Sequence, residues 1–164
     1  MLASLRGRGC LQSFDCCCAG DPCSRFFNDI NAGRYDRIVP QFATKHRHAM
    51  YGNHALAGER TTITSTTQWY GRLQRLLPDL RFKVHAVAVT GWPWHTLATV
   101  TWNDHFTLPD GSPNGNQGVH VFVLAWGRVT SLAVHYDTAK FEDYCRRMAE
   151  TGREEAMAPP ITDR

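Results

Sequence analysis

Residues 118–137 read GVHVFVLAWGRVTSLAVHYD, and this stretch decides the fold class of the chain. β-Branched and aromatic residues alternate with other side chains on both sides of Trp126 and Gly127. This pattern is typical of two strands joined by a tight turn. The sequence therefore predicts an antiparallel hairpin that reaches Asp137.

The residues before this hairpin extend the strand pattern. Residues 81–89 alternate between apolar side chains and charged or histidine side chains. The positions predicted to face inward are Phe82, Val84, Ala86 and Ala88. A Gly-Trp-Pro-Trp corner at 91–94 ends this strand pattern, and residues 96–102 (TLATVTW) form another β-branched run. Residues 108–118 are a dense cluster of turn residues. Most of this half of the chain is therefore expected to be sheet.

Apolar residues at helical spacing mark a helix near the start. Residues 26–30 place their apolar side chains on one face, and Gly33 is suited to end the helix in a left-handed conformation. Residues 35–43 (YDRIVPQFA) also have short helical spacing. Because Pro40 lies inside this segment, we expect a brief or kinked helix there.

The clearest helix lies at residues 67–77 (TQWYGRLQRLL), with Ser65 or Thr66 available as its N-cap. The polar residues 58–67 before it are expected to be a loop. A terminal helix is predicted at residues 138–152. The strands are thus grouped, with most helices ahead of them, which indicates an α+β fold. A curved antiparallel sheet with helices on one face leaves a pocket suited to a small ligand.

Composition and charge narrow the class of protein. The chain has 164 residues, 43% of them hydrophobic, which fits one soluble globular domain. Its formal net charge is +3 and its basic residues are scattered, so we expect no nucleic-acid partner. No apolar run reaches the roughly 18 residues of a membrane-spanning helix, so we expect no membrane partner.

Five of the six cysteines lie within the first 23 residues, without a zinc-binding CxxC spacing. Reduced thiols of a cytoplasmic protein explain them best. We expect residues 1–20 to be a poorly structured extension and residues 21–152 to form the domain. Residues 153–164 are expected to be a tail that is mobile or docks weakly.

Several strings between residues 24 and 140 resemble one superfamily, the nuclear transport factor 2-like proteins. Within it, the chain most closely resembles the SnoaL-like proteins, which include polyketide cyclases and relatives of ketosteroid isomerase. The matching strings are FFNDINAGRYDRIVPQFA, GNHALAGER, WYGRLQRLLPDLRF, GWPWHT, GVHVFVLAWGRV and YDT.

The resemblance implies a cone-shaped α+β fold. A strongly curved antiparallel sheet would wrap around a long helix, with a pocket between them, and two copies would form a homodimer through the outer sheet face. It implies little about chemistry, because proteins of this fold include isomerases, cyclases, hydratases and non-catalytic binding modules.

His48 is the leading candidate in KHRHAMYGNH, residues 45–54. Alternation along a strand places His46, His48 and Met50 on the less polar face. The resemblance implies a catalytic histidine at His48, and the alternative is a hydrogen-bonded residue of the pocket wall. The isomerases carry their aspartate base in this strand, but no acid is present here. For His46 and His54 we expect a structural role.

Two further residues are catalytic candidates by resemblance. His120 lies about where the isomerases place the group that donates a hydrogen bond to the substrate oxyanion, which an imidazole N–H can also do. The alternative is a buried histidine satisfied by a neighbouring strand. Asp137 resembles the general acid/base of the SnoaL-like cyclases, where burial would raise its pKa. The alternative is the N-cap of the terminal helix.

The expected ligand-binding residues are Phe27, Tyr51, Trp69, Trp102, Phe122 and His135. We expect no metal, because the His-x-His of the 45–54 stretch lacks the glutamate that a cupin-type site requires; Gly52 and Asn53 stand in its place. No other cofactor is expected.

Two functions remain open from the sequence. The first is an enzyme that binds a small hydrophobic, carbonyl-bearing ligand and catalyses isomerisation, cyclisation or hydration by acid/base proton transfer. The second is a non-catalytic module for small-molecule binding or dimerisation on the same fold.

Overall fold

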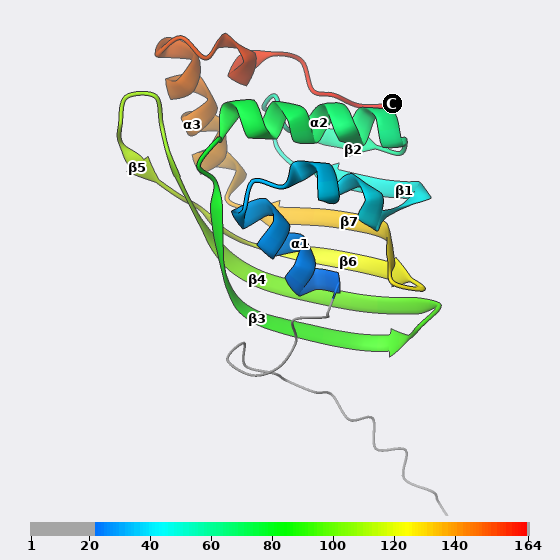
Figure 1. Ribbon diagram of the computed structural model, residues 1–164. Coiled ribbons are helices and arrows are strands. Elements are labelled where there is room, and N and C mark those ends of the chain that lie inside the picture. Colours follow the sequence, from blue (N-terminus) through cyan, green and yellow to red (C-terminus); the bar gives the residue numbers. More distant parts are fainter. Residues whose placement is uncertain (1–21, 164) are drawn as a thin grey trace, which may run out of the picture.

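The predicted hairpin lies at the centre of the sheet in the computed structural model, which describes residues 22–163 (Figure 1). Strand β6 (Gln117–Ala125) pairs antiparallel with β7 (Arg128–Tyr136). Trp126 and Gly127 between them have φ values of 52° and 76°. A two-residue type I′ turn requires positive φ at both central positions, so the prediction of this hairpin is confirmed.

The whole sheet has the strand order β2-β1-β7-β6-β4-β3. The other strands are β1 (Phe42–Met50), β2 (Gly58–Arg60), β3 (Arg81–Trp92), β4 (His95–Thr107) and β5 (Pro113–Asn114), which pairs with β4. All pairs are antiparallel except β1 with β7. The predicted antiparallel sheet is therefore mixed, because the first strand lies beside the last one and runs in the same direction.

Within residues 22–163, three α-helices accompany this sheet, and α1 and α2 lie over its concave face (Figure 1). They are α1 (Pro22–Asn31), α2 (Ile63–Leu76) and α3 (Thr138–Glu150). The predicted α+β cone, a curled sheet with helices inside it, is confirmed.

Helix α2 begins earlier than the sequence suggested. Its N-cap is Thr62, whose hydroxyl accepts a hydrogen bond from the Ser65 amide at 3.2 Å. The expected caps Ser65 and Thr66 lie inside the helix, and the expected loop at residues 58–67 contains β2 and the first turn of α2. A threonine with extended backbone is as good a cap as the residues that were favoured.

The segment around Pro40 forms two short 3-10 helices, η1 (Tyr35–Arg37) and η2 (Val39–Gln41). This agrees with the predicted brief helix, because proline is tolerated in the first turn but not farther inside. A third 3-10 helix, η3 (Glu154–Met157), follows α3.

A bulge in β3 changes which side chains face inward. The pairing of β3 with β4 shifts register between Val84 and Ala86. Val84 and Val87 pack against the core, whereas Ala86 and Ala88 are exposed. The prediction that both alanines face inward is therefore wrong, because the extra residue reverses the alternation.

The tail docks firmly on β2 and α2. Asp163 accepts hydrogen bonds from the amides of Thr61 and Thr62 at 2.6 and 3.0 Å. Glu155 in η3 forms ion pairs with Arg72 and Arg75 on α2, at 3.3 and 2.6 Å. The expectation of a mobile or weakly docked tail does not hold for residues 153–163.

Two cysteines, Cys23 and Cys145, are buried thiols within residues 22–163, and the other four lie outside the described residues together with the predicted extension over 1–20. No helix within residues 22–163 is long and apolar enough to cross a membrane.

Candidate functional site

A cavity of about 40 Å³ lies between the helices and the concave face of the sheet. Its wall is mostly apolar and comes from all three helices and from β1, β3, β4, β6 and β7. The lining residues whose side chains carry nitrogen or oxygen atoms are His48, Trp69, Tyr70, Trp102, Asp104, His120 and Tyr136. This volume holds at most a few water molecules, so an organic ligand would have to push side chains apart.

His48 of β1 is fully buried in the wall of this cavity. Its ring lies parallel to the ring of Tyr70, with centroids 5.6 Å apart. It lies perpendicular to the ring of Trp69, with centroids 4.5 Å apart. Nδ1 accepts a hydrogen bond from Nε of Arg60 at 3.3 Å. Because an arginine only donates, the His48 proton lies on Nε2.

The Nε2 atom of His48 has no hydrogen-bond partner within residues 22–163. Burial, and the positive charge of Arg60, lower the pKa of His48 well below its ordinary value. His48 is therefore a neutral imidazole with an unused N–H. Buried polar groups are rarely left unsatisfied, so this N–H is suited to a ligand oxygen.

Arg60 holds His48 in this state. Its guanidinium donates to the carbonyls of Ala57, Gly58 and Ile161 at 2.8 to 3.0 Å and lies 5.1 Å from the ring centroid of Trp69. Burial lowers the pKa of Arg60 to about 10, which leaves it charged at neutral pH.

His120 of β6 is held in the same way by a different partner. Its Nδ1 accepts a hydrogen bond from Nε1 of Trp102 at 2.6 Å, which places its proton on Nε2. The rings of Phe26 and Phe82 meet it edge-on. Burial lowers the pKa of His120 to about 3, so this imidazole is also neutral.

Asp104 of β4 supplies a carboxyl group to the same cavity. One carboxyl oxygen accepts a hydrogen bond from the backbone amide of Asn116. Burial raises the pKa of Asp104 to about 6, against the opposing effect of that hydrogen bond. Such a carboxyl can gain and lose a proton near neutral pH, as a general base requires.

No sequence model of a protein family matches this chain, and no curated protein matches it. Solved structures do match it. The chain has the nuclear transport factor 2-like fold.

Three matching structures illustrate this fold. The first is a nuclear transport factor 2-like protein from Burkholderia pseudomallei K96243, with a TM-score of 0.65 and 13% identity over 75% of this chain and 93% of that one. SalBIII, an epoxide hydrolase/cyclase-like enzyme with a role in pyran ring formation in the polyether salinomycin, has a TM-score of 0.59 and 15% identity over 73% and 90%. A SnoaL-like protein from Shewanella putrefaciens CN-32 has a TM-score of 0.58 and 13% identity over 76% and 83%.

Asp137 lies outside the cavity. It is exposed and caps α3, and its carboxylate accepts a hydrogen bond from the Lys140 amide at 3.0 Å. Alternation along β7 turns Val134 and Tyr136 towards the cavity and His135 away from it. The expectation that Asp137 faces the pocket is therefore wrong, and its alternative role as N-cap is confirmed.

His135 and Tyr51 also lie outside the cavity. Their rings stack on each other at the surface, with centroids 4.9 Å apart. Phe27 and Phe122 are buried and pack against the ring of His120 without lining the cavity. Of the six predicted ligand-binding residues, Trp69 and Trp102 line it.

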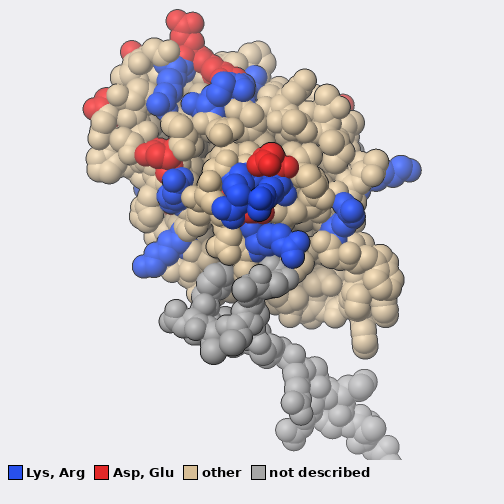
Figure 2. Space-filling model, in the orientation of Figure 1, with Lys and Arg blue, Asp and Glu red and all other residues tan. Residues whose placement is uncertain are grey.

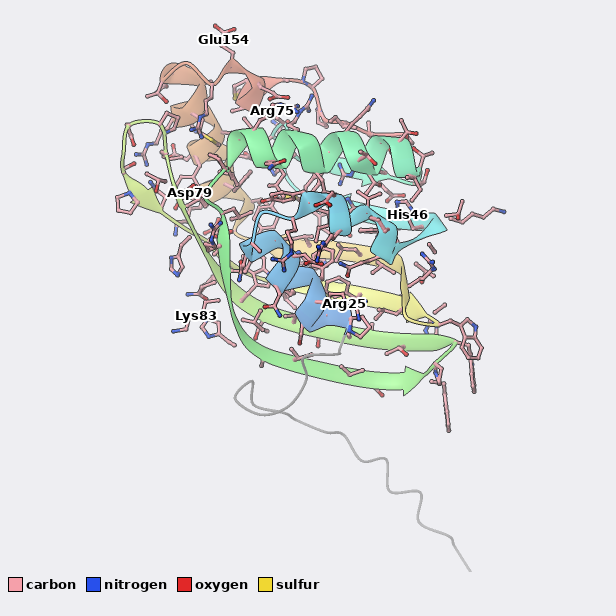
Figure 3. All side chains as sticks on the ribbon, viewed as in Figure 1. Arg25, His46, Arg75, Asp79, Lys83 and Glu154 are labelled. Carbon is pink, nitrogen blue, oxygen red and sulfur yellow. The ribbon has the colours of Figure 1, made fainter. Side chains whose placement is uncertain are left out.

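His46 and His54 have structural partners. His46 lies between β1 and α2 (Figure 3), where its ring nitrogens contact the Ala43 carbonyl and the Thr66 hydroxyl, both at 2.8 Å. His54 contacts the Tyr136 hydroxyl at 2.5 Å. These contacts agree with the structural role expected for both.

Three residues of the cavity wall with polar side chains were missed by sequence reasoning, namely Tyr70, Asp104 and Tyr136. The signal for Asp104 was present, because it alternates in step with Trp102 on one strand. Burial raises the pKa of both tyrosines, so they are neutral hydrogen-bonding groups. Within residues 22–163, no three His, Cys, Asp or Glu side chains gather in a way that could hold a metal ion.

Proposed function

We propose that this protein binds a small hydrophobic ligand with a carbonyl group in the cavity and catalyses acid/base proton transfer on it. The observation that carries this proposal is the unused Nε2–H of His48, which is buried in a cavity that Asp104 also lines. A donor without a partner, in the same cavity as a carboxyl of pKa about 6, suits the binding of a carbonyl oxygen and the removal of a nearby proton.

In the proposed reaction, the Asp104 carboxylate takes a proton from the carbon next to the carbonyl. The C–H electron pair forms the enolate double bond, and the carbonyl π electrons move to oxygen. The N–H groups of His48 and His120 stabilise that oxyanion. Return of the proton to another carbon gives isomerisation, and attack of the enolate on a second electrophilic carbon of the ligand gives cyclisation.

This assignment changes two of the expected roles. Asp104 replaces Asp137 as the base, because Asp137 is exposed and caps a helix. His48 becomes a donor together with His120, since both are neutral and hold their protons on Nε2. The role of SalBIII in pyran ring formation supports the view that this fold accommodates ring-forming chemistry.

A second candidate is a non-catalytic binding module. It needs only the apolar wall of the cavity and the unused Nε2–H of His48, and no carboxyl that titrates. Under this proposal, His48 orients the ligand and no proton moves.

Two probes distinguish these functions. We expect 2-naphthol, an aromatic analogue of an enolate, to bind and change its fluorescence, and 2-indanone to exchange its α-protons for deuterium faster in the presence of the protein. Asp104→Asn should abolish the exchange and keep the binding. Binding without exchange would favour the non-catalytic module, and neither binding nor exchange would reject both proposals.

We also propose that the protein forms a homodimer through the outer face of the sheet. Val119, Val121 and Val123 lie on that face and are half-buried in the single chain. Sedimentation velocity should show a dimer that Val121→Lys converts to a monomer, whereas a monomeric wild-type protein would refute this interface.

A further inference from the structure

Three tryptophans are exposed at one end of the sheet. Trp92, Trp94 and Trp126 are 66%, 56% and 74% exposed, although tryptophan is mostly buried in folded proteins. Two lie where β3 turns into β4, and the third lies where β6 turns into β7. We call these three residues the tryptophan tip.

The tryptophan tip is held in place by its backbone. The Trp126 amide donates a hydrogen bond to the Pro93 carbonyl at 2.6 Å, which joins the two turns. The rings of Trp92 and Trp94 stack, with centroids 5.5 Å apart and planes at 5°, and Trp126 lies 6.3 Å from Trp94. The indoles therefore form a continuous cluster at the end of the molecule.

Apolar surface continues from the tip towards the start of α1. A hollow of about 440 Å³ is lined by Trp126 of the tip and by residues of the neighbouring turn and strands, including Val89, Pro93 and Leu124. In Figure 2 this end of the molecule is an uncharged projection at the lower right. Contiguous exposed apolar surface of this kind marks an interaction site.

Positive charge lies beside this apolar surface. A second depression shares Pro22 and Gly127 with the hollow and is lined by four arginines against two aspartates. The four arginines are Arg25, Arg34, Arg37 and Arg128. Figure 2 shows basic side chains on the same face above the uncharged projection, and Arg25 projects from α1 in Figure 3.

Most of this charge is not neutralised by the protein. Arg34 pairs with Asp29 at 2.9 Å. Arg128 donates to the Pro40 carbonyl, which leaves its charge in place. Arg25 and Arg37 are exposed and form no ion pair with any residue from 22 to 163.

We propose that the tryptophan tip and its arginines bind the surface of an anionic lipid bilayer. Indole rings favour the boundary between head groups and acyl chains, and arginine favours anionic head groups. An apolar projection bordered by positive charge is complementary to that surface. This mode needs no spanning helix. It therefore departs from the expectation of no membrane partner, which rested on the absence of a long apolar run, and it does not depend on the proposed chemistry.

Single-stranded nucleic acid is a less suitable partner. Aromatic binding platforms for bases need free ring faces. Trp92 and Trp94 each use one face against the other. An indole that inserts among lipid head groups has no such requirement.

The test uses the full chain and vesicles of two compositions, phosphatidylcholine alone and an equimolar mixture with phosphatidylserine. We expect the protein to co-sediment with the anionic vesicles, with a blue shift of tryptophan fluorescence and weaker binding as salt increases. The double variant Trp92→Thr, Trp126→Asn should bind about ten-fold more weakly or worse. Asparagine before Gly127 suits the type I′ turn, so this hairpin should remain folded.

Two further variants test the parts separately. Arg25→Gln and Arg37→Gln should each weaken binding to anionic vesicles about five-fold. Met157→Ala removes another exposed apolar side chain, 61% exposed and located in η3, and should leave binding unchanged.

Three results would overturn the proposal. One is an absence of binding to phosphatidylserine vesicles at low salt. Another is undiminished binding by the folded double variant. The third is evidence that the tip serves another partner while vesicles are not bound. Such evidence would be a dimer that dissociates in the double variant, or oligonucleotide binding that the tryptophan substitutions abolish.

Discussion

Nε of Arg60 donates a hydrogen bond to Nδ1 of His48 at 3.3 Å, and this contact decides which nitrogen of His48 holds the proton. The same guanidinium donates to the carbonyl of Ile161 in the C-terminal tail. The tail, Arg60 and the cavity are therefore linked by consecutive hydrogen bonds. A positioned second residue that fixes the tautomer of a functional histidine is a common feature of active sites.

We expect Arg60→Met to destabilise the protein by about 2–4 kcal/mol, because one buried carbonyl and two partly buried carbonyls lose their donor. The pKa of His48 should rise, because Arg60 lowers it, although burial is the larger cause and remains. Nitrogen-15 NMR of the imidazole should show protonation of Nδ1. Arg37→Met, at an exposed arginine that forms no ion pair with any residue from 22 to 163, is the control. A His48 tautomer that is unchanged in a folded Arg60 variant would contradict this role.

Asp163→Ala should lower Tm by a few degrees at pH 7, because the carboxylate accepts from the amides of Thr61 and Thr62 and from the Ser65 hydroxyl. The Thr61 amide, followed by the Ser65 hydroxyl, lowers the pKa of Asp163 to about 2. The pKa of Asp163 is lower in the fold than its value of 3.8 in the unfolded chain, so its carboxylate stabilises the fold above pH 3.8. That stabilisation is lost as the pH falls towards 2. Thermal unfolding should therefore show a difference from wild type that shrinks below pH 3.8. Asp143→Ala, on exposed α3, should show a smaller effect.

The sequence predicted those parts of the fold that depend on local pattern. Alternation and the Trp126-Gly127 turn identified the central hairpin, and helical spacing identified all three α-helices. The bulge near His85 in β3 could not be predicted, because one extra residue reverses the alternation without changing composition. The parallel pairing of β1 with β7 depends on segments about 80 residues apart, on which periodicity gives no information.

The residues of the cavity were predicted only in part, because local pattern identifies some of them and not others. His48 and His120 follow from strand alternation, and both line it. Resemblance directed attention to Asp137, but a one-position difference at the end of β7 turns Tyr136 inward instead. The contact of Arg60 with Ile161 spans 101 residues, so nothing in the local sequence indicates that the tail supports His48.

Taken alone, the contribution of His120 to stability should fall below pH 6.5, because His120 stays neutral when folded. Its pKa is 6.5 in the unfolded chain and about 3 in the fold, where burial lowers it. Between these values the unfolded state binds one more proton, so the free energy of unfolding decreases by about 1.4 kcal/mol for each pH unit of acidification.

The variant His120→Gln tests this linkage, since its amide oxygen still accepts from Trp102. Urea unfolding at pH 8 should show a less stable variant, and at pH 5 that deficit should be about 2 kcal/mol smaller. His85→Gln, at an exposed histidine, should keep the wild-type pH dependence. Equal deficits at both values would mean that His120 is protonated in the folded protein.

Asp104→Asn should remove the proposed base and also stabilise the protein. Burial raises the pKa of Asp104 from 3.8 to about 6, so ionisation above pH 6 costs the folded state up to about 3 kcal/mol. At Asp104 the folded state binds more protons between these values, so the contribution of this residue to wild-type stability decreases as pH rises through them. The gain of the variant should be near zero below pH 4 and largest above pH 6, as urea unfolding would show.

In the wild type, deuterium exchange into 2-indanone should rise with pH with a midpoint of about 6, because the base must be ionised. Asp36→Asn, at an exposed carboxylate, should change neither stability nor exchange. A variant that gains stability but retains exchange would separate the buried charge from catalysis and identify another base.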